Sequence, residues 1–432
     1  MSRAAAPASP SRPATHPSFE SDLCVKCNIC TAACPVAGVT LLFPGPKAVG
    51  PQAARYSSPA HRVIDPATAW CSGCGVCSRV CPHAVPVAEM NIVAKAELLP
   101  GPRLALRDWG ISRPSEVARW MRLIRPLASL ALRSRVLRAL ADVTLGLARH
   151  APLPAPAARS LRRRRSDLVH GRPLNAAAAP DRPRVAYFHG CSTEDYEPWL
   201  GETAIEVLEH LGVDVELPPQ ECCGLPLQSN HALARAGQRA RRNLASLAPW
   251  ADHGIPIVGT STSCTLALKH EYRAVLGISG AGVDSVASNT YDFFEYLEHL
   301  FGLDRIEPRL QPLPLHVLYH APCQLRAHGV GAPALKVLRA IPELRLEVSQ
   351  AECCGVAGTY GLKSERYEVA TAVGRELFDQ VQSSPFDRVV TDSETCRWWI
   401  EAHSQVPAVH PVELLAESLG LPGRRPRGSG PR

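Results

Sequence analysis

Sixteen cysteines are the side chains of this 432-residue sequence with the most evident chemistry, and eight of them form two copies of one pattern. The copies are "CVKCNICTAACP", which starts at Cys24, and "CSGCGVCSRVCP", which starts at Cys71. This C-x2-C-x2-C-x3-C-P spacing is typical of bacterial two-cluster ferredoxins, in which the fourth cysteine of each run ligates the other cluster. We therefore predict two [4Fe–4S] clusters with crossed ligands, one on Cys24, Cys27, Cys30 and Cys81, and the other on Cys71, Cys74, Cys77 and Cys34.

Structural zinc is the alternative for these two runs, because C-x2-C pairs also bind zinc. Each run is complete, however, and each ends in a proline, at Pro35 and at Pro82. The full spacing therefore favours clusters over zinc.

The other eight cysteines divide into two sets with nearly equal intervals. In the first set the adjacent pair begins 31 residues after the first cysteine, and the last cysteine follows 41 residues after the pair ends. In the second set the same two intervals are 30 and 42 residues. The matched intervals indicate an internal repeat. The two sets are Cys191, Cys222, Cys223 and Cys264, and Cys323, Cys353, Cys354 and Cys396.

The elements that must position these cysteines also repeat. A strand-like run, "PRVAYFHGC" or "LHVLYHAPC", leads to the first cysteine, and a helix and a short strand lead to the pair. Another helix and an apolar strand, in "IPIVGTSTSC" or "DRVVTDSETC", lead to the last. Alternating strands and helices predict a mainly parallel sheet, whose ligands lie beyond the carboxyl ends of the strands. We expect an α+β multidomain fold, with an N-terminal α-helical ferredoxin-type domain followed by tandem α/β repeats.

The adjacent thiols suit a multinuclear cluster, because both can bend toward one cluster and contact two of its iron atoms. Gly224 and Gly355 follow the two pairs, and a residue without a β-carbon lets the backbone turn tightly beside the sulfurs. Iron–sulfur ligation is favoured at each repeat, and zinc stays open as the alternative. Buried free cysteines that pack as small hydrophobic residues would not account for the matched intervals.

These motifs resemble a known family. The repeats are similar to the cysteine-rich CCG domains of heterodisulfide reductases and of the iron–sulfur subunits of glycolate, lactate and glycerol-3-phosphate oxidising systems. With the ferredoxin runs in front, the layout is most similar to the C subunits of anaerobic glycerol-3-phosphate dehydrogenases. The resemblance covers Phe19 to Leu421 and is loose between Leu104 and Pro183. It is carried by "FPGPKAVGP", "ECCGLPLQSN", "GTSTSCTLALKHEY", "ECCGVAGTYGLKSERY" and "VVTDSETCRWWIE".

The resemblance implies a non-catalytic electron-transfer subunit. Such a subunit takes electrons from a flavoprotein dehydrogenase partner and passes them to membrane quinone, at the cytoplasmic face of the cell membrane. The chain has no G-x-G-x-x-G fingerprint and no P-loop, so we expect neither flavin nor NAD in it. One alternative is an iron–sulfur subunit of a glycolate or lactate oxidase or of a heterodisulfide-reductase-like complex. The other is a structural zinc-binding scaffold.

The closing motif of each repeat departs from the heterodisulfide-reductase pattern. That pattern ends in C-x-x-C, whereas Ser261 and Ser393 occupy the first position here, in "STSC" and "SETC". Four cysteines suffice for an ordinary [4Fe–4S] cube. Simple electron transfer is therefore favoured over disulfide chemistry, and a repeat that has lost its metal stays open.

The middle of the chain is strongly basic. Between Arg113 and Arg172 there are fourteen arginines and no lysine against three acidic residues, a difference of +11. Apolar residues in this stretch, among them Val117, Trp120 and Leu130, recur near helical spacing. A basic amphipathic helix of this kind can lie on an anionic membrane surface. The alternative is a helical linker that packs on its own domains; nucleic acid is not expected, because no binding fold accompanies the basic run.

The remaining features set the boundaries. No run of about eighteen apolar residues exists, so no membrane-spanning helix is expected. His189 and His320 could donate to cluster sulfur or replace a ligand, and Trp398 and Trp399 could face a quinone; structural roles are the alternative for all four. The expected segments are a disordered tail at 1–17, the ferredoxin-type domain at 18–103, a basic helical connector at 104–182, and the two cysteine-rich domains at 183–303 and 313–422.

Overall fold

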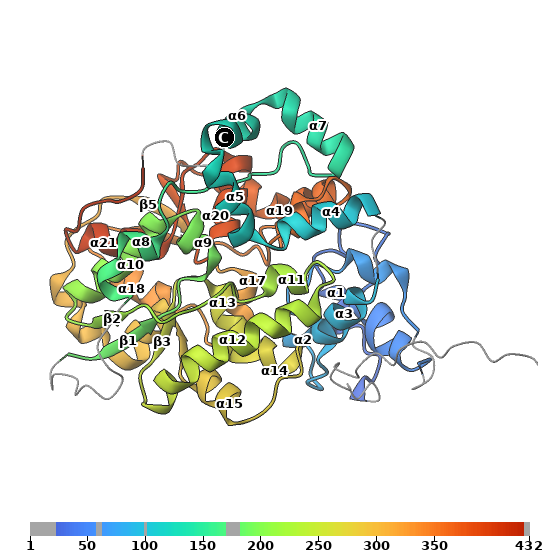
Figure 1. Ribbon diagram of the computed structural model, residues 1–432, viewed down its shortest axis with the longest axis horizontal. Coiled ribbons are helices and arrows are strands. Elements are labelled where there is room, and N and C mark those ends of the chain that lie inside the picture. Colours follow the sequence, from blue (N-terminus) through green and yellow to red (C-terminus); the bar gives the residue numbers. More distant parts are fainter. Residues whose placement is uncertain (1–22, 58–62, 99–101, 170–181, 427–432) are drawn as a thin grey trace, which may run out of the picture.

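The computed structural model describes residues 23–57, 63–98, 102–169 and 182–426, so the tail expected at 1–17 lies outside the described residues. Two sheets with their helices form most of the body, the N-terminal helices lie at one side, and the connector helices α4 to α7 lie across the top (Figure 1). The fold class predicted from the sequence is confirmed.

Each repeat contains one four-stranded parallel sheet. The strand orders match: β2-β1-β3-β4 in the first repeat and β6-β5-β7-β8 in the second. Runs such as "VAY" and "VLY" are buried on both faces, as parallel strands between two layers of helices require. The strands are β1 (Arg184–Tyr187), β2 (Asp214–Glu216), β3 (Ile257–Gly259), β4 (Thr290–Asp292), β5 (His316–Tyr319), β6 (Arg345–Val348), β7 (Arg388–Val390) and β8 (Ala408–Val409).

The helices of the first repeat cover both faces of its sheet. The long helix α12 is amphipathic, since Ala236, Ala240, Leu244 and Leu247 recur every three or four residues and are buried. The helices are α9 (Gly190–Asp195), α10 (Pro198–His210), α11 (Leu225–Gln228), α12 (Leu233–Asp252), α13 (Thr262–Leu266), η5 (Ala267–Glu271), α14 (Tyr272–Ala274), α15 (Ala281–Ser288), α16 (Phe293–Tyr296), η6 (Leu297–Phe301), η7 (Leu303–Arg305) and η8 (Glu307–Arg309).

The second repeat has a similar order of helices. Its long helix α19 buries Ala370, Leu377 and Val381 along one face. The helices are α17 (Cys323–Ala327), α18 (Ala334–Ala340), η9 (Tyr360–Leu362), α19 (Ser364–Gln382), α20 (Glu394–Ser404) and α21 (Pro411–Ser418).

The two repeats share one hydrophobic core. Buried residues of α10, such as Leu200 and Ile205, belong to the same cluster as Val337 of α18 and Leu415 of α21. The outer faces have separate cores, one under α12 and one under α19 and α20. Because the shared core spans both sheets, the two repeats form one rigid platform.

The N-terminal part contains short helices around the two ferredoxin runs. Two small cores, one around Val87 and Met90 and one around Phe43 and Val49, support the loops. The second of these cores also packs against Val369 and Val373 of α19. The helices are α1 (Ile29–Ala32), η2 (Ala48–Gln52), η3 (Pro66–Trp70), α2 (Val76–Arg79) and α3 (Val87–Ala96).

The connector is helical, as the spacing predicts, but its apolar residues face two ways. Val117 and Met121 of α5 turn toward the interior, whereas Trp120 and Ile124 are exposed. The stretch is therefore not one amphipathic helix, because Pro114, Pro126 and the turn at Ser134 divide it into separate helices. The helices are α4 (Pro102–Ile111), α5 (Pro114–Leu123), α6 (Arg125–Arg133), α7 (Arg135–Leu145), α8 (Leu161–Arg164) and η4 (Ser166–Leu168).

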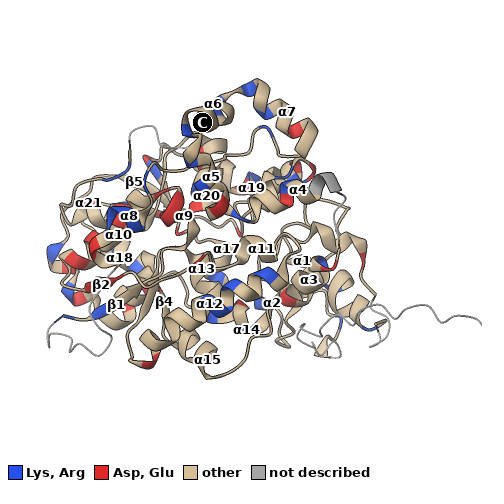
Figure 2. Cartoon of the chain, in the orientation of Figure 1, with Lys and Arg blue, Asp and Glu red and all other residues tan. Residues whose placement is uncertain are grey.

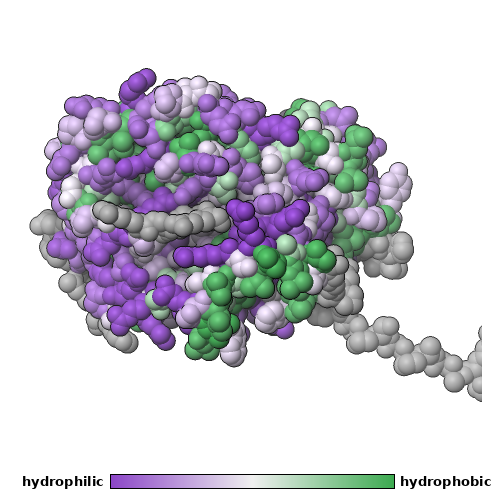
Figure 3. Space-filling model, turned by 90° about the horizontal axis from the view of Figure 1, so that it is seen from above, coloured by the Kyte–Doolittle hydropathy of each residue, from purple (hydrophilic) through white to green (hydrophobic). Residues whose placement is uncertain are grey.

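The outer face of α6 and α7 is apolar with arginines among the apolar side chains. Leu127 is 66% exposed, Val136 76% and Val143 73%, and Figure 3 shows a hydrophobic patch on this upper surface. Figure 2 shows the positions of Lys and Arg residues along the same two helices. Among the described residues, no helix combines the length and apolar character needed to cross a bilayer.

Candidate iron–sulfur site

The two ferredoxin loops have matching backbone conformations. In the first run Lys26 and Asn28 adopt positive φ values of 63° and 67°, and in the second Gly73 and Gly75 adopt 71° and 81°. In each run these two residues are the second and the fourth after the first cysteine, which is Cys24 or Cys71. Positive φ is uncommon outside glycine, so its recurrence at matched positions indicates that each loop must curl around a common centre.

The eight thiols of these loops gather in the two crossed sets that the spacing predicts. Each set lines a small cavity of its own. Ligation itself stays a prediction, because the structure shows the positions of the thiols alone. One cavity is lined by Cys24, Cys27, Cys30 and Cys81, and the other by Cys34, Cys71, Cys74 and Cys77.

The electrostatics of the thiols fit a cationic centre. Burial raises the pKa of Cys34 to about 11 and that of Cys74 to about 12. Burial and then the neighbouring thiols raise the pKa of Cys77. Thiols with a raised pKa stay protonated when no metal is bound. Four neighbouring thiols can ionise together only where a positive charge, such as that of cluster iron, balances the negative charge of the thiolates. The donor set therefore fits iron–sulfur clusters.

The four cysteines of each repeat come from three loops at the carboxyl ends of its strands. Cys191 lies in α9 after β1, the pair Cys222 and Cys223 follows β2, and Cys264 lies in α13 after β3. Cys323, Cys353, Cys354 and Cys396 occupy the corresponding positions around β5, β6 and β7. The prediction that each set lies at this end of its sheet is confirmed.

Hydrogen bonds join the thiols of each repeat in the same order. The Cys264 thiol donates to Cys223 over 3.4 Å between sulfurs, and Cys354 and Cys396 are 3.2 Å apart. Hydrogen bonds from Cys191 and then Cys223 lower the pKa of Cys222. In the second repeat, bonds from Cys323 and Cys354 lower the pKa of Cys353 in the same way. Each repeat thus holds four buried or half-buried thiols that are linked in series by hydrogen bonds.

The glycine after each pair has the role expected from the sequence. Gly224 has a φ of 96° and Gly355 a φ of 95°, both in the left-handed region. The Gly355 amide donates to the Cys353 sulfur at 3.3 Å, and the Gly224 amide bonds to Cys222. A hydrogen bond to sulfur stabilises the thiolate that a metal requires.

The second ferredoxin set adjoins the thiols of the second repeat. After burial, the nearby Cys353 thiol is the next cause that raises the pKa of Cys74, and Cys74 acts likewise on Cys323. An ion-pair bridge closes the contact, since Glu352 accepts from Arg79 at 2.7 Å and pairs with Arg326 at 2.9 Å. The two sets therefore lie side by side although Cys74 and Cys353 are 279 residues apart in sequence.

A cavity of about 450 Å³ joins the two repeats. Cys191, Cys223 and Cys264 line it from the first repeat, and thiols of the second repeat line it from the other side. Its remaining walls are largely apolar and come from the connector, as Met121, Leu132 and Leu145. Ser261 and Ser393 also line it, so the serines that replace the expected cysteines face this space.

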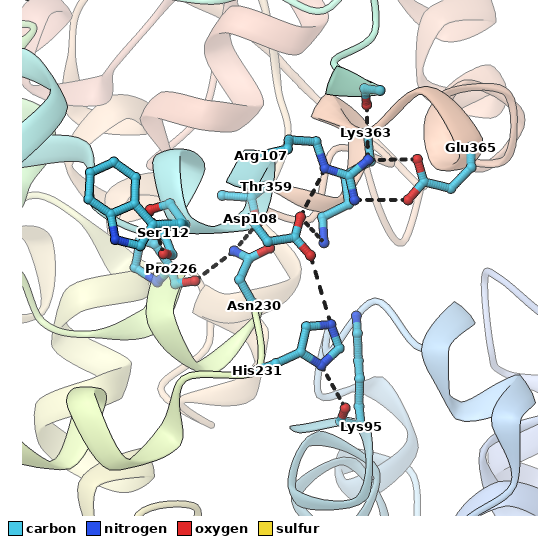
Figure 4. Close-up of polar contacts among 12 residues, drawn as sticks. Lys95, Arg107, Asp108, Ser112, Pro226, Asn230, His231, Thr359, Lys363 and Glu365 are labelled. Carbon is cyan, nitrogen blue, oxygen red and sulfur yellow. Dashed lines mark hydrogen bonds and ion pairs between the residues drawn. The ribbon is translucent and has the colours of Figure 1, made fainter. Parts of the chain in front are cut away.

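A polar network holds the connector against the other parts (Figure 4). Arg107 of α4 makes two hydrogen bonds to Glu365 of α19, at 2.8 and 3.0 Å, and one to Asp108 at 2.9 Å. Lys363 pairs with Asp108 at 3.1 Å. His231 of the first repeat donates to the Lys95 carbonyl at 2.9 Å. Residues from all four parts of the chain therefore meet in one polar network, and nothing in their local sequence indicates this.

The histidines and tryptophans take different positions. His189 is buried with Nδ1 2.7 Å from the Gly190 carbonyl, a structural contact. His320 is fully buried near Cys353, and neither of its ring nitrogens makes a hydrogen bond within the described residues, so its role stays a prediction. Trp398 lines the cavity and donates to Glu197 at 3.0 Å, whereas Trp399 is packed in the core.

All sixteen cysteines are free thiols. No three His, Cys, Asp or Glu side chains in the described part of the chain converge closely enough to hold a single metal ion. Sequence reasoning missed Lys95, whose ammonium donates to the Cys71 carbonyl at 2.7 Å. No local pattern indicates that contact, because 24 residues separate the two.

The fold and the thiol sets define a protein with a ferredoxin-type part and two CCG repeats. Comparison with family models agrees: a 4Fe-4S dicluster domain matches residues 20–85, and a cysteine-rich domain matches 185–269 and 317–401. The chain is 36% identical to the C subunit of the anaerobic glycerol-3-phosphate dehydrogenase of Escherichia coli K12, over 93% of this chain and 99% of that protein. It therefore belongs to the family of anaerobic glycerol-3-phosphate dehydrogenase C subunits, and the resemblance seen in the sequence is confirmed.

More distant relatives share about half of the chain. The B subunit of the fumarate reductase (CoM/CoB) of Methanothermobacter marburgensis is 28% identical over 54% of this chain and 44% of that protein. The lactate utilization protein A 2 of Bacillus cereus AH820 is 21% identical over 55% of this chain and 99% of that protein. Part of the sequence is therefore similar to proteins whose names indicate other substrates.

Proposed function

We propose that the chain is the electron-transfer subunit that passes electrons from a flavin-containing glycerol-3-phosphate dehydrogenase partner to membrane quinone. One observation carries the proposal: the cysteine sets succeed one another from the surface to the interior. Cys27 is exposed, Cys74 lies beside Cys353, and thiols of both repeats line one cavity.

Iron–sulfur clusters on these sets would supply one-electron oxidation and reduction. The four cysteines of each crossed ferredoxin set would hold a [4Fe–4S] cluster, and the four of each repeat would hold one more, with zinc as the alternative at a repeat. The chain's own contribution is to exclude water from the thiols and to aim backbone amides such as those of Gly224 and Gly355 at sulfur.

The first ferredoxin set is the proposed point of entry. Around the exposed Cys27, apolar side chains are also exposed, among them Val25 at 58%. Leu23 and Ile29 extend the same surface. Exposed apolar residues next to a redox centre are what a docking partner would cover, so we assign this surface to the flavoprotein partner.

The cavity between the repeats is the proposed site of quinone reduction. Its volume of about 450 Å³ lies within the range of small-molecule sites, roughly 300–1,000 Å³. Leu132, Leu145 and Met121 offer an apolar wall to a lipophilic ring, and the thiols of both repeats form the opposite side. Electrons would therefore reach a quinone from either repeat.

The apolar outer face of α6 and α7 is the proposed contact with an anionic membrane. Exposed Leu127, Val136 and Val143 would enter the interface, and arginines such as Arg133 and Arg135 would meet lipid phosphates. The same helices supply Leu132 and Leu145 to the cavity. A quinone dissolved in the bilayer would thus have a short way to the thiols, at the inner face of the cell membrane.

Reoxidation of the reduced protein tests the quinone site. The protein is purified without oxygen, reduced with dithionite and mixed with a decyl-quinone, and the recovery of cluster absorbance is followed. Met121→Trp fills the cavity and should slow reoxidation by roughly tenfold or more, while Leu127→Trp on the outer face should not. Ferricyanide, which needs no cavity, should reoxidise both equally. Equal quinone rates in the two variants would exclude the cavity.

A related electron path with another donor is the second candidate. The similarity to the lactate utilization protein covers 55% of this chain. Mixing the reduced flavoprotein of either system with this chain distinguishes the two, because only the cognate donor should reduce it at a rate that saturates with donor concentration.

A further inference from the structure

A second, polar cavity of about 610 Å³ lies beside the first repeat, apart from the apolar cavity proposed for quinone. Its walls come from α5, α8, α9, the loop before Cys222, and α12. Cys222 is the one thiol of its set that lines this cavity rather than the apolar one. Its lining contains eight arginines and no lysine: Arg113, Arg119, Arg122, Arg162, Arg163, Arg235, Arg239 and Arg242.

Positive charge exceeds negative charge in this lining. Four acidic residues face the eight arginines, so four positive charges are in excess. Three of the acids are already used in ion pairs. The pairs are Arg122 with Asp195, Arg239 with Glu116, and Arg242 with Glu221.

Three of the arginines have no acidic partner within the described ranges. Arg119 on α5, Arg163 on α8 and Arg235 on α12 make none of the ion pairs found there. All three are exposed at the rim, on three different helices that converge on one opening. Guanidinium groups from three directions can surround a ligand that no single surface arginine would hold.

Helix ends add to the same potential. Helix α12 has no acidic residue in its first turn, and Arg235 and Arg239 stand in its first two turns. Helix α5 has Arg113 at its N-cap position, without a capping hydrogen bond from that side chain, and the one acidic residue of its first turn, Glu116, is paired with Arg239. The N-terminus of a helix carries partial positive charge, so arginines there are unfavourable unless an anion is present.

The arginines also act on one another across the cavity. Arg113 is buried; burial first, and then Arg235 and Arg239, lower the pKa of its guanidinium. Arg162 and Arg163 of α8 line the same cavity as Arg235 and Arg239 of α12. The protein therefore holds together cations that repel one another, and an anionic ligand would relieve that repulsion.

We infer that this cavity is a binding site for a phosphate ester. The planar guanidinium fork matches two phosphate oxygens, and arginine without lysine is the usual choice for such bidentate recognition. Two sources share this chemistry: a soluble phosphate ester and the headgroup of an anionic phospholipid. The rim allows either, because exposed Trp120 and Leu123 follow Arg119 on α5.

Binding to the complete, oxygen-free protein tests the inference, and no electron acceptor is present, so its outcome is independent of the proposed electron path. Inorganic phosphate and glycerol phosphate are titrated by calorimetry at constant ionic strength. Phosphatidylglycerol vesicles, with phosphatidylcholine vesicles as reference, are tested by sedimentation. The variant is Arg119→Gln with Arg235→Gln, which leaves no acidic partner unpaired. Arg241→Gln is the matched control, because Arg241 is exposed on α12 but lies outside the cavity.

Two results support the inference. Saturable binding of phosphate or its ester, weakened at least tenfold in the double variant and unchanged in Arg241→Gln, assigns the soluble source. If only phosphatidylglycerol vesicles bind, and their binding is weakened in the double variant and unchanged in Arg241→Gln, the ligand is the lipid headgroup. Arg163→Gln, on α8, is a further variant, and it should weaken binding of the same ligand that the double variant binds less tightly. If no probe distinguishes the double variant from the wild type, or if Arg241→Gln loses as much affinity, the site does not exist.

Discussion

Gly75 of the second ferredoxin loop and Ala327 of α17 approach so closely that a β-carbon built on Gly75 would lie 3.2 Å from that of Ala327. Gly75 follows Cys74, and Ala327 closes the helix that begins at Cys323. The contact therefore joins the elements that carry two neighbouring thiol sets, and it fixes the distance over which an electron would pass.

Replacement of Gly75 by alanine should separate these two elements slightly. Gly75→Ala adds a β-carbon at the contact and strains a φ of 81°, whereas Gly73→Ala strains a φ of 71° but meets only Ile92 at 3.5 Å. Left-handed strain costs about 1–2 kcal/mol in either case. We expect slower electron transfer between the ferredoxin part and the second repeat in Gly75→Ala alone, measured by stopped-flow. Equal rates in the two variants would mean that the contact does not limit transfer.

The crossed ligand sets predict which substitutions act alike. Cys24→Ala and Cys81→Ala should remove the same paramagnetic signal, and Cys34→Ala and Cys71→Ala should remove the other, because the members of each pair line one cavity. Electron paramagnetic resonance of the four reduced variants decides this. If Cys24→Ala instead matched Cys34→Ala, each run would hold its own cluster and the crossed assignment would be wrong.

The two glycines after the cysteine pairs should differ in their tolerance of a side chain. A β-carbon on Gly355 would lie 1.9 Å from the Ala370 carbonyl oxygen, whereas one on Gly224 would meet Ala236 at 3.4 Å. Gly224→Ala should cost only the left-handed strain, about 1–2 kcal/mol. Gly355→Ala should cost at least about twice that, since the backbone of α19 must shift.

Amide hydrogen exchange measures this difference, as the free energy of local opening in α19 and in α12. The iron retained after gel filtration is a second reading. Similar protection of the two helices in their respective variants would show that the close approach at Gly355 is relieved without cost.

Sequence reasoning located the thiols well because the relevant forces are local. Alternating strands and helices, matched intervals and Gly224 and Gly355 are all written in short stretches, and the structure confirms the positions they predict. Strands β4 and β8 were not predicted. They contain three and two residues, too few to show a pattern, and their neighbours in the sheet decide their conformation.

Contacts between distant segments could not be predicted. Nothing near Gly75 indicates Ala327, and nothing near Arg107 indicates Glu365. The connector shows the same limit: helical spacing placed Val117 and Trp120 together, but only the position of the repeats decides that Val117 lines a cavity and Trp120 is exposed. Burial depends on what packs opposite a helix, and a single sequence does not state that.

The ion pair between His270 and Glu89 should make the docking of the ferredoxin part depend on pH. The two side chains meet at 2.9 Å between Nε2 and Oε1, and Glu89 belongs to α3. The hydrogen bond to Glu89 raises the pKa of His270 above 6.5. Burial opposes the shift at Glu89, yet the bond from His270 lowers its pKa below 4.5.

The sign follows from these directions. The contribution of His270 is fully present below pH 6.5 and is lost as the pH rises through its higher pKa in the folded protein. The contribution of Glu89 is present above pH 4.5 and is lost as the pH falls through its lower folded pKa. Protection of α3 amides, corrected for intrinsic exchange, should therefore decrease above pH 6.5, and His270→Asn should abolish that dependence. His299→Gln is the control, because His299 pairs with Glu298 of its own repeat; an unchanged pH profile in His270→Asn would refute the role of the pair.

Iron, acid-labile sulfide and zinc per chain, measured on oxygen-free protein together with its reduced paramagnetic spectrum, test the central claim most directly. Three or four filled thiol sets require about twelve to sixteen iron atoms and as many sulfides, with centres that dithionite reduces. Colourless protein that contains zinc and no reducible centre would show that these sixteen cysteines conduct no electrons.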